Sequence, residues 1–215
     1  MVTHLTRAHW ILIAVNAAYL VPLAVMLAAR GDWEFLGYVS QVIALLVLLM
    51  ATIKKTHFPV WLLALLSIWA ALHMAGGAVT VGDGVLYAWQ IVHIVGSGDA
   101  YVLKYDQVIH FYGFFVATFV AYWLLLPQLK SVWRPGSIAF VAMLAGMGFG
   151  AMNEIIEFIA VLTAPETGVG GYYNTAIDMV ANALGALAAA LIIAYSSVGR
   201  AFHTMLCEQR LTNTD

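Results

Sequence analysis

Long uninterrupted apolar runs are the feature that most narrows what this chain can fold into. The runs cover residues 8–29, 33–53, 58–75, 102–126, 136–162 and 172–195. A helix needs about 20 apolar residues to cross a bilayer, whereas the strands of membrane barrels show shorter alternating segments. Only 9% of the residues are charged, against about 25% in soluble domains. We therefore predict an all-α polytopic membrane protein, with six transmembrane helices in one membrane domain, residues 1–215.

The connection between the third and fourth runs breaks this pattern. Residues 76–101 contain several glycines and enclose an apolar piece, residues 85–95. That piece is too short to cross a membrane, so we predict an interfacial or re-entrant helix there. The first run is longer than the apolar core of a typical signal peptide and lacks a convincing small-residue cleavage site. We expect it to be a spanning helix.

The basic residues are divided unequally between the two ends of the predicted spans. One side would hold Arg7, Lys54, Lys55, Lys130, Arg134, Arg200 and Arg210, and the other Arg30 and Lys104. Cytoplasmic loops carry the excess of Lys and Arg, so both termini are expected in the cytoplasm and residues 76–101 outside. The net charge of −2 gives no reason to expect a nucleic-acid partner, and the single Cys207 indicates neither a disulfide nor a thiol site.

Ionisable and amide side chains interrupt four of the apolar runs. With both termini in the cytoplasm, all of these side chains lie at a similar depth, toward the outer surface of the membrane. They are His73, Asp106, His110, Asn153, Glu154, Glu157, Asn174, Asp178 and Asn182. A charged residue within a spanning helix costs about 2.5–3.5 kcal/mol on insertion scales, so such residues need partners and are functional candidates. Spacings of three or four residues place the two members of each of these pairs on one helix face: Asp106 and His110, Glu154 and Glu157, and Asp178 and Asn182. We predict that the side chains share a polar pocket open to the outer surface.

Carboxylates and imidazoles without thiolates suit a divalent ion such as Zn, Mn or Fe, as a mononuclear site or a site for two ions. We predict Asp106, His110, Glu154 and Asp178 as metal ligands. Glu157 would act as general base, and His73 as a ligand or acid. Asn153, Asn174, Asn182 and Tyr173 would support the site. The leading hypothesis is hydrolysis or transfer on an amphiphilic, lipid-linked or cell-envelope substrate.

Two alternatives stay open at this point. The polar groups could form a hydrogen-bonded, partly protonated network that locks the helices of an accessory subunit. They could also serve a non-catalytic carrier or binding protein, although the inner halves of the helices show little polarity. Tyr172 and Tyr173 also fit an interfacial aromatic belt. Gly146, Gly150, Ala181, Gly185 and Ala189 have the four-residue spacing of tightly packed membrane helices.

An ordered set of four motifs resembles the YjdF-like bacterial inner-membrane proteins. The motifs are His73-Met74-Ala75-Gly76-Gly77, Tyr105-Asp106-Gln107-Val108-Ile109-His110-Phe111, Asn153-Glu154-Ile155-Ile156-Glu157 and Asn174-Thr175-Ala176-Ile177-Asp178-Met179. The Asp-x-x-x-His, Glu-x-x-Glu and Asp-x-x-x-Asn elements are more distantly similar to VanZ-like proteins, associated with glycopeptide resistance. Gln107 stands where those proteins commonly have a basic residue, and Glu157 where they have Gln. The resemblance implies a bacterial inner-membrane location and motif positions that belong together; it supplies no reaction.

Overall fold

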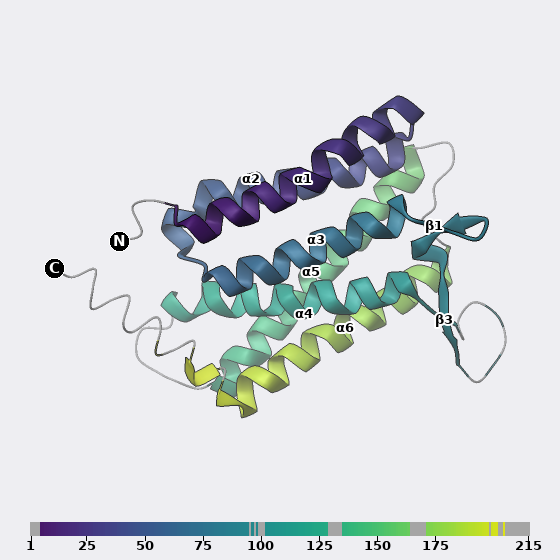
Figure 1. Ribbon diagram of the computed structural model, residues 1–215. Coiled ribbons are helices and arrows are strands. Elements are labelled where there is room, and N and C mark those ends of the chain that lie inside the picture. Colours follow the sequence, from purple (N-terminus) through teal and green to yellow (C-terminus); the bar gives the residue numbers. More distant parts are fainter. Residues whose placement is uncertain are drawn as a thin grey trace. The chain divides into compact units, whose positions relative to one another are not determined.

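Long helices make up most of the described part of the chain (Figure 1). The computed structural model describes residues 5–94, 96, 98, 102–128, 135–163, 171–197, 199–201 and 204. The helices are α1 (Arg7–Arg30), α2 (Trp33–Thr56), α3 (Val60–Ala78), α4 (Tyr105–Leu125), α5 (Pro135–Thr163) and α6 (Tyr172–Tyr195). All six are long and apolar enough to cross a membrane, which confirms the predicted fold class. A 3₁₀ turn, η3 (Leu126–Gln128), follows α4.

Local signals fix the ends of the first three helices. Gly31 adopts a left-handed backbone (φ 71°) just after α1, and its N–H bonds to the carbonyls of Leu27 and Ala28. The Asp32 side chain then accepts the N–H of Phe35 at the start of α2. Pro59 precedes α3, where its missing N–H leaves no helical bond unmade. These caps explain why the connections between the first three helices are short.

The connection between α3 and α4 contains no α-helix in its described residues and only a three-residue 3₁₀ turn, so the helix predicted for residues 85–95 is wrong. It contains β1 (Thr80–Val81), β2 (Gly84–Val85), the 3₁₀ turn η1 (Leu86–Ala88), β3 (Gln90–His93) and β4 (Val102–Lys104). Strand β1 pairs antiparallel with β2, and β3 with β4. The N–H of Leu86 donates to Val79 and that of Tyr105 to Trp89. Pairing between extended segments thus satisfies backbone groups that a helix would have bonded internally.

The chain divides into two compact parts, and the boundary runs through α4, α5 and α6. The N-terminal part holds residues 2–109 and 155–177, and the α4–α6 part holds residues 110–154 and those from 178 onward. Three of the predicted basic markers, Lys130, Arg134 and Arg210, and also Cys207, lie outside the described residues. The single membrane domain stays a prediction.

In the α4–α6 part, the predicted small-residue packing is confirmed. A methyl group at Gly185 would overlap the backbone of α4 at Phe111, and one at Gly146 would overlap Thr118. At Gly150 a methyl group would lie 2.8 Å from Nδ2 of Asn182. Ala189 is fully buried and Ala181 is 8% exposed. Small residues at these positions let the three helices approach closely, which brings their polar side chains within bonding distance.

The N-terminal part packs α1, α2 and α3 around an apolar cluster. Leu20 and Leu27 from α1, Val39 and Val42 from α2, and Ala70 and Met74 from α3 form its centre. The α3–α4 connection lies against the end of α3, where a methyl group at Gly76 would overlap the ring of Tyr87. A glycine at this position is therefore required for Tyr87 to reach α3.

Candidate functional site

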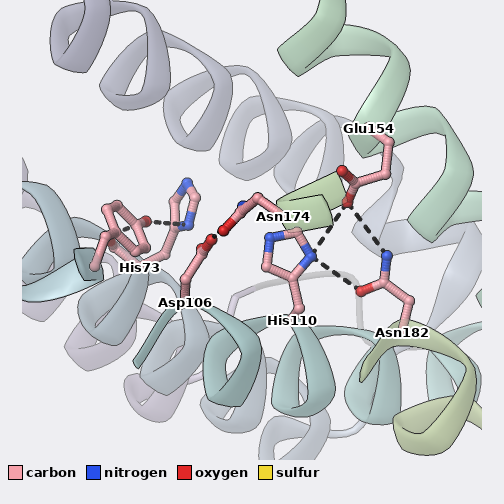
Figure 2. A network of polar contacts seen from close by, with 7 residues as sticks. His73, Asp106, His110, Glu154, Asn174 and Asn182 are labelled. Carbon is pink, nitrogen blue, oxygen red and sulfur yellow. Dashed lines mark hydrogen bonds and ion pairs between the residues drawn. The ribbon is translucent and has the colours of Figure 1, made fainter. Parts of the chain in front are cut away.

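The α4–α6 part contains a buried polar cluster built from three helices. Nδ1 of His110 on α4 lies 3.0 Å from Oδ1 of Asn182 on α6 and 3.3 Å from Oε1 of Glu154 on α5. Nδ2 of Asn182 donates to the same Glu154 oxygen over 3.4 Å. Figure 2 shows the imidazole, the carboxylate and the amide turned toward one another. The structure thus brings three of the predicted site residues together in this part.

Asp178 lies beside this cluster on α6, one helical turn before Asn182. Its side chain is fully buried, and a carboxylate oxygen lies within 4.8 Å of a ring nitrogen of His110. Asn182, Glu154 and His110 are 1%, 7% and 8% exposed. Two carboxyl groups enclosed by apolar helices cannot both be ionised cheaply unless a cation or a hydrogen-bond donor lies between them. Protonated His110 or a bound divalent ion would meet that requirement.

The donor set fits a divalent ion by its chemistry. A ring nitrogen, two carboxylates and an amide oxygen are ligand types that Zn, Mn or Fe accept, and all come from rigid helices. Three predicted ligands, His110, Glu154 and Asp178, lie in the α4–α6 part. The fourth, Asp106, belongs to the N-terminal part and stands one helical turn before His110 on α4. Binding of one ion by all four stays a prediction.

A second polar cluster lies in the N-terminal part and joins the starts of α4 and α6. Oδ2 of Asp106 accepts a hydrogen bond from Nδ2 of Asn174 over 3.2 Å. Oδ1 of Asn174 accepts one from the Lys104 ammonium over 3.3 Å. Figure 2 shows the Asn174 amide directed at the Asp106 carboxylate. The amide thus connects a cation to an anion, which fixes its orientation and supports its predicted role beside Asp106.

His73 is held by Tyr87, a residue the sequence analysis did not single out. The Tyr87 hydroxyl lies 2.6 Å from Nδ1 of His73 and donates to the His73 carbonyl oxygen, also over 2.6 Å. Since the hydroxyl has one proton and gives it to the carbonyl, Nδ1 is the donor toward the tyrosine. This favours the tautomer that carries the proton on Nδ1 and the lone pair on Nε2. The ring of Trp69 stacks on the His73 imidazole, with the two ring centroids 5.1 Å apart.

The pKa of the Tyr87 hydroxyl links Glu157, the second predicted catalytic residue, to the surroundings of His73. Burial raises the pKa of Tyr87 well above its ordinary value of 10.0. The negative charge of Asp106 raises this pKa further, followed by smaller contributions from Tyr38, Glu157 and Tyr105. Asp106 and Glu157 therefore both act on the hydroxyl that positions His73. Within the N-terminal part, both predicted catalytic side chains are associated with Tyr87.

The remaining predicted residues are less closely tied to these clusters. Asn153 is partly buried on α5 beside Glu154, and its supporting role stays a prediction. Tyr173 is 63% exposed at the start of α6, as an aromatic belt residue would be. Gln107, which was not among the candidates, is 1% exposed, and its side chain accepts the N–H of Lys104 over 2.8 Å. Gln107 therefore fixes the start of α4.

Replacing Tyr87 with phenylalanine is expected to flatten the dependence of stability on alkaline pH. The pKa of Tyr87 is higher in the folded than in the unfolded state. The stability that the buried, protonated hydroxyl contributes is therefore complete below about pH 10 and is lost as pH rises through the folded-state pKa. Thermal unfolding in detergent should show the wild type losing up to about 1.4 kcal/mol more per pH unit than Tyr87→Phe above pH 10. The exposed Tyr172→Phe is the matched control. Parallel curves for wild type and Tyr87→Phe would contradict the burial of this hydroxyl.

Comparison with known proteins places the chain in a family. Residues 8–198 match the family described as "Predicted membrane protein (DUF2238)". The chain belongs to this family. A relative in Thermotoga maritima, described as "Uncharacterized protein", is 32% identical over 104 residues, which cover 47% of this chain and 53% of the relative. The match thus spans about half the length of that relative. No solved structure matches this DUF2238 protein.

Proposed function

We propose that this DUF2238 protein binds a divalent metal ion inside the membrane through His110, Glu154 and Asp178, with Asp106 as a further ligand. The observation that carries the proposal is the burial of one imidazole against the oxygens of Glu154 and Asn182, beside the fully buried Asp178. Ionisable residues in spanning helices are rare, and their usual reason is function. Glu154 and Asp178 are compatible with low dielectric when a cation neutralises them.

The reaction class we propose is metal-assisted hydrolysis or group transfer on an amphiphilic, lipid-linked or cell-envelope substrate. A bound divalent ion would supply Lewis acidity and an activated water. Glu157 would accept the proton of that water, and His73 would act as a ligand or an acid through Nε2, since Tyr87 contacts Nδ1. We further propose a bacterial inner-membrane location with both termini in the cytoplasm, from the distribution of Lys and Arg and from the YjdF-like and VanZ-like motifs.

Metal analysis of purified protein tests the ligand set directly. The full chain, prepared in neutral detergent without chelator, should carry about one divalent ion per chain. Asp178→Asn should lower the affinity for that ion at least about tenfold, since the loss of an outer-shell partner alone costs about 10–100-fold. The matched control is Asp83→Asn, an exposed carboxylate in the β1–β2 turn. Absence of bound metal, with unchanged thermal stability in chelator, would remove the ligand roles.

A structural role is the second candidate, and one observation favours it. Asn182 hydrogen-bonds to both His110 and Glu154, and His110 lies within ion-pair distance of Glu154, so direct contacts among the three side chains bridge three helices. In that case Asp178→Asn would lower stability or assembly without changing metal content.

A carrier is the third candidate. Flux of the bound ion into proteoliposomes, abolished by Glu157→Gln, would support transport in place of catalysis.

A further inference from the structure

A hollow of about 130 Å³ opens in the N-terminal part where α4 and α6 begin. Lys104 and Asn174 line it together with the apolar side chains of Val102 and Ile177. By the measure that assigns about 10–15 Å³ to one water, the hollow has room for roughly ten waters. It is smaller than the roughly 300–1,000 Å³ of sites for drug-sized ligands. A small polar group fits this space, and a whole lipid or cofactor does not.

The charge in this hollow comes from Lys104. Among the described residues, its ammonium bonds to the neutral oxygen of Asn174, which leaves two of its three N–H donors for a ligand. The Asn174 amide stands between this ammonium and Asp106, so the acidic side chain is not part of the lining. Lysine binds phosphate as a compact point charge. The hollow therefore suits a phosphate-bearing group better than a neutral or cationic one.

The position of the hollow along the helices indicates the source of that group. Lys104 directly precedes α4, and Tyr172 is the first residue of α6, so both stand at the ends of candidate membrane spans. Tyr172 and Tyr173 also line the hollow, and they are 82% and 63% exposed. Tyrosines at the ends of spanning helices lie at the level of lipid headgroups. Val102 and Ile177 supply apolar walls for the adjoining glycerol or acyl portion.

We propose that this hollow binds the phosphate headgroup of a membrane lipid, with Lys104 as the cation that holds it. The inference does not need a bound metal, because it rests on Lys104 and on the tyrosines that line the hollow, none of which is a proposed metal ligand. It adds a recognition site for an anionic lipid to a protein whose proposed chemistry acts on amphiphilic substrates. Metal content and lipid binding are separate measurements, so either proposal can fail alone.

Native mass spectrometry of the full chain in neutral detergent, titrated with phosphatidic acid, tests this site. We expect one tightly bound phosphatidic acid per chain and at least about tenfold weaker binding in Lys104→Gln. Lys104→Arg should retain the affinity within about threefold because it keeps the charge. Phosphatidylcholine, which carries no net charge, should bind more weakly than phosphatidic acid by a similar factor.

Two controls make the test specific. Arg30→Gln removes a cation at the end of α1 that does not line the hollow, and should leave phosphatidic acid binding unchanged. Ile177→Phe fills the hollow while keeping Lys104, and should weaken binding as Lys104→Gln does. Equal binding by wild type and Lys104→Gln, or equal losses in Lys104→Gln and Arg30→Gln, would overturn the proposal. Full displacement by millimolar inorganic phosphate would overturn the lipid assignment and point to a free anion instead.

Discussion

Replacing His110 with leucine is expected to lower the free energy of unfolding by about 3–5 kcal/mol. The substitution removes the group that lies 3.3 Å from Glu154 Oε1 and 3.0 Å from Asn182 Oδ1. It would leave the carboxyl groups of Glu154 and Asp178 buried without that partner or without an ion held by it. Thermal or denaturant unfolding in neutral detergent measures the loss. His93→Leu, on exposed β3, is the matched control and should change stability by less than about 0.5 kcal/mol.

A double-mutant cycle separates an ionic cluster from an ordinary hydrogen bond. His110→Leu with Glu154→Leu should cost less than the sum of the two single substitutions, because the double variant leaves only the Asp178 carboxyl group without His110, whereas His110→Leu alone leaves two carboxyl groups without it. Hydrogen bonds between membrane helices average about 0.6 kcal/mol in such cycles and reach about 1.7 kcal/mol. A coupling above that limit would require a charged pair or a shared ion. A value near 0.6 kcal/mol would instead assign His110 and Glu154 to neutral helix packing.

Repeating the cycle in chelator distinguishes the two charged possibilities. If a metal holds His110 and Glu154 together, the coupling should fall when the ion is removed, because the ligands lose their common partner. If protonated His110 pairs with Glu154 directly, the coupling should be unchanged by chelator. The second outcome would contradict the metal proposal while keeping the cluster.

The helices and the inward faces of their polar residues could be predicted because both follow from short-range rules. Apolar run length gave six spans, and the ends of α1, α5 and α6 lie within a residue or two of the expected bounds. The four-residue spacing of Asp178 and Asn182 placed both on one buried face, where they are fully buried and 1% exposed. Such features follow from the length of the apolar runs and from the helix period, and predicting them does not require knowing how the helices pack together.

The α3–α4 connection could not be predicted in the same way. Its conformation depends on pairs far apart in sequence, such as Gln90 opposite Lys104, and periodicity in a short apolar segment cannot reveal such a pair. Tyr87 was missed for the same reason, since it reaches His73 only after the connection folds back. One signal was present in the sequence. Gly76 at the end of α3 indicated a close approach, although not which side chain makes it.

Gly185→Ala is expected to be the most damaging single-methyl change among the glycines of α5 and α6. The added carbon would overlap the carbonyl oxygen of Phe111 and lie 2.9 Å from its carbonyl carbon and 3.1 Å from the nitrogen of Phe115. These are backbone atoms of α4, so no side chain can rotate to make room, and α6 must move away. Overpacking typically costs about 1–3 kcal/mol and sometimes more. Thermal unfolding in detergent measures the loss of stability, and the metal content measures how far the displacement of α6 disturbs the proposed metal site.

Two glycines of α5 provide graded controls. Gly148 has nothing within 4 Å of an added methyl group, so Gly148→Ala should be neutral or stabilising by up to about 1 kcal/mol through reduced backbone entropy. Gly146→Ala would meet the Thr118 side chain, which donates to Phe114 over 2.8 Å and can rotate at the expense of that bond. Its cost should therefore be intermediate. If Gly185→Ala were as harmless as Gly148→Ala, α4 and α6 would not be in backbone contact at Phe111, and the distance from His110 to Asn182 would lose its structural basis.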